Sequence, residues 1–221
     1  MAAPDMAAGA PPDCDGPGPP LSRCGLVLAF VAMNRVIYNT ATTLNGYLAD
    51  ANDSLAWLFV VDQGEIPSSD RFARFLEGIG ATVQGSTTYE WVLREEKMLE
   101  NPDAWRKVFG DKPAFVFTTR DLPRPEGIDV RFVRGEVAPL LPAIYEAAGG
   151  GDIWLIGGGD LAGQFDDAHA LHELRLSLAP VTLTDGKPLL PRNLGADRLT
   201  LREVEQQGQF AALTYDVKPR G

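Results

Sequence analysis

Cysteine is scarce in this sequence. Cys14 and Cys24 are the only two cysteines among 221 residues, and both fall within the first 25 positions. The sequence therefore offers no disulfide framework, no zinc-ligand spacing and no catalytic thiol in the part that is rich enough in apolar residues to fold. Because cysteine-poor chains suit a reducing compartment, we expect a cytoplasmic protein.

Clusters of basic residues are also absent. Lys and Arg number 20 against 30 Asp and Glu, which gives a formal net charge of −10. Proteins that bind nucleic acid neutralise phosphates with a basic patch, so no nucleic-acid partner is expected. Any phosphate site in such an acidic chain must depend on backbone N–H groups, hydroxyls and a few arginines.

No apolar run is long enough for a membrane span. The apolar run 26–32 is too short to cross a bilayer and lacks the basic start of a secretory signal. Residues 1–32 are otherwise rich in Pro, Gly, Ala and Asp, a composition that cannot bury enough apolar surface to order itself. We expect 1–32 to be a disordered or mis-called N-terminal extension, and 33–221 to form one domain without internal repeats.

From Met33 onward, strand and helix patterns alternate. Strands are predicted at 35–40, 81–84, 114–118, 129–133, 153–156, 174–183, 199–204 and 210–217, and helices at 68–78, 87–93, 137–148 and 161–168. Pro180 is expected to mark an edge or a bulge of its strand. Alternating elements followed by strands alone predict an α/β fold. Its sheet is mostly parallel, with helices on both faces and antiparallel C-terminal strands.

Three glycines, Gly157, Gly158 and Gly159, separate the apolar strand 153–156 from the helix that follows. A strand, a glycine turn and a helix N-terminus form a geometry that holds phosphate, because helix N–H groups point at the anion. The run is neither G-x-G-x-x-G, since Ala162 stands at the third position, nor a P-loop. A tight strand-to-helix turn without a ligand is the alternative interpretation.

Two further junctions carry hydroxyl groups. In the first, Gly85 precedes Ser86, Thr87 and Thr88, which form either an anion seat or an ordinary capping box with Glu90. The second ends the strand at 114–118 with Thr118, Thr119 and Arg120. Two hydroxyls and a cation suit a ribose phosphate, although a solvated loop start would have the same composition.

The order and separation of several motifs resemble the dihydrofolate reductase superfamily. The motifs lie at 43–50, 53–58, 85–90, 154–159, 173–181 and 186–191. The sequence looks closest to stand-alone relatives of the reductase domain of the riboflavin-biosynthesis deaminase/reductase, over residues 33–217. This resemblance implies a dihydrofolate reductase-like fold that binds NADPH. It also implies reduction of a small heterocyclic or carbonyl-type substrate, similar to the pyrimidine reductase of riboflavin biosynthesis.

The resemblance also implies roles for individual residues. Cofactor phosphates would be held by Gly85, Ser86, Thr87 and Thr88. The adenine ribose and its 2′-phosphate would lie beside Thr119 and Arg120. The pyrophosphate and nicotinamide ribose would be wrapped by Gly157, Gly158, Gly159, Asp160 and Leu161. The substrate pocket would be bordered by Thr43, Asn45, Gly46 and Asp53.

Two residues are candidates for the chemistry. Asp70 lies near the position where dihydrofolate reductases carry a buried carboxylate, and it is either a proton source or pterin anchor, or a solvated first-turn acid. Asn45 stands where the family opening often has an acid; it cannot supply a proton, and it either borders the pocket or shapes a turn. Ser86 replaces a frequent cation, which leaves Arg120 to recognise the 2′-phosphate. A non-catalytic protein that binds a nucleotide cofactor is therefore the alternative function.

Three further expectations concern metals, tryptophans and assembly. The acidic and histidine residues between Asp166 and Glu173 match no metal-ligand spacing, so no metal site is expected. The four tryptophans are interpreted as core residues. Apolar strands with no later helix to cover them predict a homodimer, unless helices of the same chain cover these faces. Its expected contacts, around 176–183 and 210–217, are Leu176, Leu178, Phe210 and Leu213.

Overall fold

The computed structural model describes residues 34–64, 68–95 and 97–219. The expected N-terminal extension 1–32 lies outside the described residues, so a domain start near Met33 stays a prediction. The side chain of Asp70 lies outside them as well, although its backbone belongs to a helix. Among the described helices, none combines the length and the apolar composition needed to cross a membrane.

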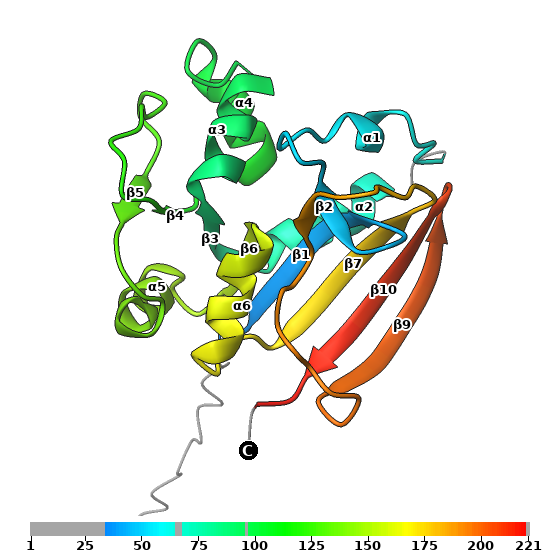
Figure 1. Ribbon diagram of the computed structural model, residues 1–221. Helices are drawn as coiled ribbons and strands as arrows, with labels where there is room; N and C mark the ends of the chain where they lie inside the picture. Colours follow the sequence, from blue (N-terminus) through cyan, green and yellow to red (C-terminus); the bar gives the residue numbers. More distant parts are fainter. Residues whose placement is uncertain (1–33, 65–67, 96, 220–221) are drawn as a thin grey trace, which may run out of the picture. The chain divides into compact units, whose positions relative to one another are not determined.

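Eight strands form one sheet in the order β5-β4-β3-β6-β1-β7-β10-β9 (Figure 1). The parallel strands are β1 (Val36–Thr43), β3 (Ile79–Gly85), β4 (Ala114–Phe117), β5 (Val130–Val133), β6 (Asp152–Gly157) and β7 (Glu173–Ala179). The strand β10 (Phe210–Val217) runs antiparallel to β7, and β9 (Leu199–Gln207) runs antiparallel to β10. The predicted α/β class and its antiparallel C-terminal strands are confirmed.

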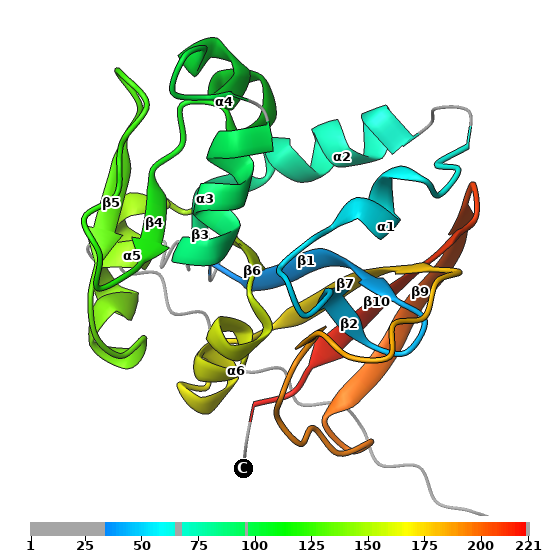
Figure 2. The same cartoon turned by 45° about the horizontal axis from the view of Figure 1, so that its top comes forward.

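Helices cover both faces of this sheet (Figure 2). One face packs against α5 (Leu141–Ala147), which follows the 3₁₀ turn η1 (Ala138–Leu140), and against α6 (Gly159–Asp167). The other face packs against α2 (Ser68–Glu77), α3 (Ser86–Glu95) and α4 (Pro102–Phe109). Successive strand residues point to opposite faces, so Val36 and Tyr38 join the first core while Ile37 joins the second.

The structure contains short elements that the sequence pattern did not predict. They are α1 (Ala56–Phe59), α4, and a separate two-stranded ribbon of β2 (Tyr47–Ala49) and β8 (Lys187–Pro188). Tertiary packing accounts for α4, because its buried Trp105 lies edge-on to Tyr89 with ring centroids 6.0 Å apart. The expectation for Pro180 is wrong: β7 ends at Ala179, and the proline lies beyond the strand rather than at an edge or bulge.

His172 makes folding stability depend on pH. The Val36 N–H donates to its Nδ1 at 3.0 Å, and burial lowers the pKa of this histidine below its usual 6.5, with a smaller contribution from Arg35. Because the pKa is lower in the folded state than in the unfolded chain, protonation favours unfolding. The stabilising contribution is present above about pH 6.5 and is lost as pH falls toward the folded-state pKa.

We therefore expect the free energy of unfolding to fall between about pH 7 and about pH 5 more steeply in the natural chain than in His172→Asn. Asparagine retains an acceptor for the Val36 N–H and does not titrate. Urea unfolding at a series of pH values measures both profiles. Parallel profiles would show that His172 does not contribute.

Candidate active-site cleft

Two adjoining cavities open where parallel strands end, the usual ligand position of an open α/β sheet. The first, about 430 Å³, lies over the ends of β3, β4 and β5, and we call it the hydroxyl-rich cavity. The second, about 450 Å³, lies between α1, α3 and the end of β6, and we call it the apolar cavity. Both are lined by Thr87, Thr88, Gly158 and Asp160, so the two cavities adjoin, and we call them together the cleft.

Two helix N-termini meet where the cavities join. Helix α3 begins at Ser86, directly after β3, and α6 begins at Gly159, with one residue between it and the end of β6. Gly158 is the N-cap of α6 with no side-chain cap bond, and a Cβ there would meet no heavy atom within 4 Å. The first N–H groups of a helix have no intrahelical partner, so the two helix starts, together with the hydroxyls of Ser86, Thr87 and Thr88, could hold an anion, and we call this place the anion seat.

Glycine occupies these three consecutive positions for different structural reasons. A Cβ on Gly159 would lie 2.1 Å from the carbonyl oxygen of Pro188, so glycine is required there for packing against β8. A Cβ on Gly157 would lie 3.3 Å from the Thr88 Oγ1, which reflects the close approach of α3 to β6. The Gly157–Gly158 peptide bond is cis. Among these three glycines, only Gly158 has open space where a Cβ would lie, and this space is beside the anion seat.

The cation that lines the hydroxyl-rich cavity is Arg134, which sequence analysis missed. Arg134 follows β5, and its guanidinium pairs with Asp121 at 3.2 Å, with both side chains largely exposed. Thr119 also lines the cavity, but Arg120 does not. The Arg120 guanidinium instead makes a two-pronged ion pair with Glu90 on α3, with Nη1 at 3.0 Å from Oε1. Parallel pairing of β4 and β5, which the sequence did not specify, brings Arg134 to this edge.

The apolar cavity has aromatic walls and few charges. Trp57 of α1 and Trp91 of α3 line it. The interpretation of the tryptophans as core residues holds for Trp57, Trp105 and Trp154, which are buried in core clusters, whereas Trp91 is only partly buried. The aliphatic lining of the cavity comes from Leu48, Leu55, Leu58, Val92 and Ile156. Asp53 lies in the lining and pairs with Lys187 at 3.5 Å. The cavity therefore suits a flat and mostly uncharged group.

Asp160 is the other carboxylate in the lining. Its Oδ1 lies 3.2 Å from Nη1 of Arg192, and the Gln164 amide donates to its second oxygen at 2.9 Å. The Arg192 guanidinium donates hydrogen bonds to Asp167 and Asp160, and these bonds raise its pKa above the usual value. The bond to Asp167 has the larger effect. Within the described residues, Asp53 and Asp160 are thus the acids that face the apolar cavity.

Other residues proposed from the sequence lie in a turn next to the cleft. The Thr43 hydroxyl donates to Asn45 Oδ1 at 3.0 Å, and Asn45 Nδ2 donates to the Leu183 carbonyl at 2.6 Å. Gly46 completes the turn with φ of 83°. None of Thr43, Asn45 and Gly46 lines the two cavities. The Asn45 amide thus stabilises the turn through these bonds. Of the two interpretations that the sequence left open, this arrangement favours a residue that shapes a turn.

The acidic residues near the two histidines pair with arginines. Asp166 is buried, and its Oδ1 lies 2.6 Å from Arg198 Nη2. Glu173, also buried, accepts hydrogen bonds from Arg35 and Arg202 at 2.8 and 3.1 Å. In the described part of the chain, no three His, Cys, Asp or Glu side chains gather in a way that could hold a metal ion.

This sheet order and cleft define a protein with the dihydrofolate reductase-like fold. Dihydrofolate reductase from Enterococcus faecalis, solved as a complex with NADP(H), aligns with a TM-score of 0.50 and 15% identity. The alignment covers 85% of this chain and 98% of that chain. The chain belongs to the RibD C-terminal domain family, whose profile matches residues 34–213. The predicted superfamily is thus confirmed.

Two solved structures share this fold, and one curated protein is similar in sequence. RibD of Acinetobacter baumannii aligns with a TM-score of 0.59 and 17% identity, over 85% of this chain and 59% of that chain. A protein of Shewanella sp. PV-4, provisionally named for riboflavin biosynthesis, gives a TM-score of 0.65 and 24% identity, with 84% and 99% covered. The uncharacterized protein YwjB of Bacillus subtilis strain 168 is 28% identical over 182 residues, which are 82% of this chain and 97% of YwjB.

Proposed function

We propose that this protein is an NADPH-dependent reductase of a small heterocyclic or carbonyl-type substrate, similar to the pyrimidine reductase of riboflavin biosynthesis. The observation that carries the proposal is the cleft, in which the anion seat lies between a hydroxyl-rich cavity and an adjoining apolar one. A dinucleotide has this order of parts: a phosphorylated adenosine, a pyrophosphate and a flat nicotinamide ring. The NADP(H) complex of the E. faecalis enzyme and the names of the RibD relatives support it.

The chain's own groups have distinct tasks under this proposal. Bound NADPH would supply the hydride, which is the cofactor's chemistry. Backbone N–H groups at the starts of α3 and α6 would hold the pyrophosphate, and Thr119 would contact the adenine ribose. Trp57 and Trp91 would exclude water and fix the ring that receives the hydride. Asp53 is the lining acid we assign to the substrate side of the cleft.

The second candidate is a protein that binds the nucleotide cofactor without catalysis. Asn45 favours it, because this residue cannot supply a proton and its amide is bonded within the turn. Steady-state NADPH oxidation over a panel of pterin, pyrimidine and quinone substrates distinguishes the two. Turnover of any substrate supports the reductase, whereas cofactor binding without turnover across the panel supports the binding protein.

Arg134 is expected to decide the preference for NADPH over NADH. It lines the hydroxyl-rich cavity, whereas Arg120 is held by Glu90 outside the lining. A charge-assisted hydrogen bond contributes about 1.5–3 kcal/mol. Arg134→Ala should therefore weaken NADPH binding about ten- to a hundredfold and leave NADH nearly unchanged. Calorimetric titration of both cofactors measures this.

Arg120→Ala is the matched variant for that experiment. If it changes NADPH affinity much less than Arg134→Ala, recognition of the 2′-phosphate belongs to Arg134. If Arg120→Ala produces the larger and NADPH-specific loss, the sequence-based assignment of Arg120 holds and ours to Arg134 fails.

We also propose a homodimer in the cytoplasm. Phe210 is buried against Trp57, and Leu176 packs on the core of its own chain, so neither is free for an interface. Apolar surface remains on the edge strand β9, where Val204 is 61% exposed and lies opposite Leu213 of β10. Cytoplasmic location rests on the scarcity of cysteine.

Light scattering tests this assembly. The natural chain should show twice the 23.9 kDa monomer mass, and Val204→Asp should reduce it to the monomer value. Leu99→Asp, at another exposed apolar position outside the sheet, should leave the dimer intact. A monomer mass for the natural chain would contradict the homodimer.

A further inference from the structure

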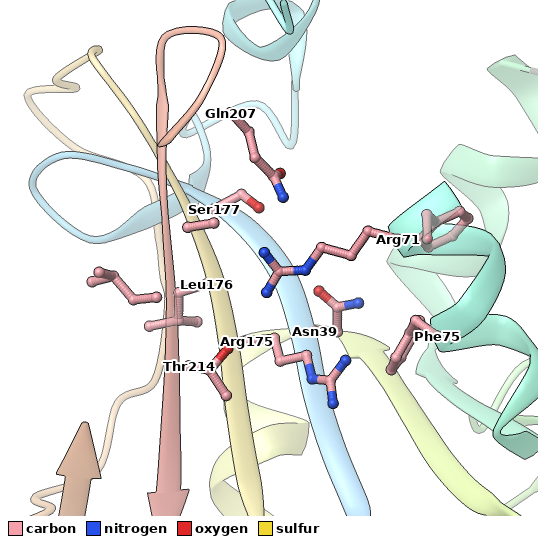
Figure 3. Close-up of a pocket in the computed structure, with 11 residues that line it drawn as sticks. Asn39, Arg71, Phe75, Arg175, Leu176, Ser177, Gln207 and Thr214 are labelled. Carbon is pink, nitrogen blue, oxygen red and sulfur yellow. The ribbon is translucent and has the colours of Figure 1, made fainter. Parts of the chain in front are cut away.

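A third pocket lies between α2 and the face of β1, β7 and β10 (Figure 3). It encloses about 140 Å³, and we call it the arginine pocket because Arg71 and Arg175 both line it. Figure 3 shows the two guanidinium groups on either side of Asn39. The remaining polar lining consists of Ser177, Gln207 and Thr214, and the lining contains no carboxylate. A pocket with two cations and no acid in its lining favours a negatively charged ligand group.

Arg175 has hydrogen-bond donors to spare. Its Nε donates to the buried Glu173, and its guanidinium lies 5.1 Å from the ring centroid of Phe75. Within the described residues, its two terminal amino groups make no hydrogen bond. Four N–H groups in a fixed, planar arrangement are therefore available to a carboxylate or a phosphate.

Arg71 can exchange its present partners for a ligand. It pairs with Glu203 at 3.0 Å and with Glu205, and the side chains of these glutamates are 48% and 43% exposed. Exposed ion pairs contribute little to stability, so replacing one glutamate by a ligand oxyanion costs little. Neither glutamate lines the pocket, so the guanidinium stands between them and the cavity.

The neutral polar groups point to the same ligand chemistry. Thr214 is 5% exposed, and its hydroxyl makes no hydrogen bond in the part of the chain that the structure describes. The side chains of Asn39 and Ser177 are half-buried and likewise make no hydrogen bond among the described residues. The two hydroxyls and the amide N–H groups are therefore available to donate to a bound oxyanion.

The arginine pocket follows the apolar cavity along one strand. Asn39 lines the pocket, and Ala41 lines the apolar cavity. Residues two apart on a strand share a face and lie about 6–7 Å from each other, so one flat molecule can reach both sites. Its reactive end would lie beside the nicotinamide and its charged end beside the arginines.

We propose that the arginine pocket binds an oxyanion, a carboxylate or a phosphate, carried by the substrate of the reductase. This inference rests on the proposed function for the identity of the ligand as a substrate, but the binding of an oxyanion can be measured without the cofactor. The substrate class is thus a flat, mostly uncharged ring that carries an acidic group. This group lies about as far from the carbon that receives the hydride as Asn39 lies from Ala41 along β1.

The test is a titration of the full chain with two probes, inorganic phosphate and benzoate. The NMR signals of the arginine Nε–H groups monitor binding of each probe. These signals report locally, so an anion bound at the helix N-termini does not contribute. We expect saturable shifts of Arg71 and Arg175 in the natural chain. Arg175→Gln, observed through Arg71, and Arg71→Gln, observed through Arg175, should each weaken binding about tenfold or more. Tighter binding of phosphate indicates a phosphoester substrate, and tighter binding of benzoate a carboxylate.

Arg131→Gln is the matched control, because Arg131 is exposed, pairs with Asp129 and lies outside the arginine pocket. It should leave the titration unchanged. The proposal is overturned if neither probe shifts Arg71 or Arg175, or if Arg71→Gln, which breaks only exposed ion pairs, binds like the natural chain. A separate NADPH titration distinguishes the two claims: absence of cofactor binding would contradict the reductase and leave the oxyanion result standing.

Discussion

Gly158→Val is expected to abolish NADPH binding while the chain stays folded. The glycine has φ of −90° and ψ of −177°, an extended conformation that valine readily adopts, and a Cβ there meets nothing within 4 Å. The side chain would instead project into the part of the cleft that both cavities share. Phosphate needs close approach to the helix N–H groups, so the branched side chain would occupy its place.

Isothermal calorimetry measures the effect. We expect the dissociation constant for NADPH to rise about a hundredfold or more, which corresponds to about 2.7 kcal/mol. Gly78→Val is a matched control, since Gly78 lies at the end of α2, away from the cleft, with its nearest Cβ contact at an ordinary 3.6 Å. An unchanged NADPH affinity in Gly158→Val would place the cofactor elsewhere.

The largest expected effect on stability comes from Glu173→Gln. Glu173 is 1% exposed, yet three arginines bond to its carboxylate: Arg35 at 2.8 Å, Arg202 at 3.1 Å and Arg175. Glutamine has nearly the same shape but no charge, so the three guanidinium groups lose their shared counter-ion. Breaking a buried ion pair from one side costs about 3–5 kcal/mol. Because these arginines are partly exposed, we expect a loss of about 3 kcal/mol.

Thermal and urea unfolding measure this loss. For a chain of this size, about 3 kcal/mol lowers Tm by about 6–12 °C. Glu203→Gln is the matched control: this glutamate is 48% exposed and pairs with a single arginine, so its loss should cost about 1 kcal/mol or less. Equal and small losses in both variants would show that the buried carboxylate contributes no more than a surface one.

The sequence predicts the fold well where elements are long and buried. The strand at 210–217 has the same bounds as β10, and the apolar strand before the three glycines is β6 within one residue at each end. Prediction fails where tertiary contacts determine the structure. Helix α4 packs through the buried Trp105 and Phe109, and β2 pairs with β8, which lies far away in the sequence. Short elements of this kind have no periodicity to detect.

The cleft could be predicted only in part for a related reason. Glycine and hydroxyl residues at the ends of β3 and β6 are visible in the sequence, because a strand, a turn and a helix follow one another there. Arg134 and Trp57 reach the cleft through strand order and a long loop, and local patterns do not specify either. The arginine pocket likewise joins α2 to β1, β7 and β10, which are distant in sequence.

The central claim is that the cleft at the ends of β3, β4 and β6 holds NADPH. A crystal structure of the chain with NADPH tests it most directly. The account predicts the pyrophosphate between the N-termini of α3 and α6, the adenosine beside Thr119 and Arg134, and the nicotinamide in the apolar cavity beside Gly157 and Trp57. A cofactor bound outside this cleft, bound in the reverse direction, or not bound at saturating concentration would contradict it.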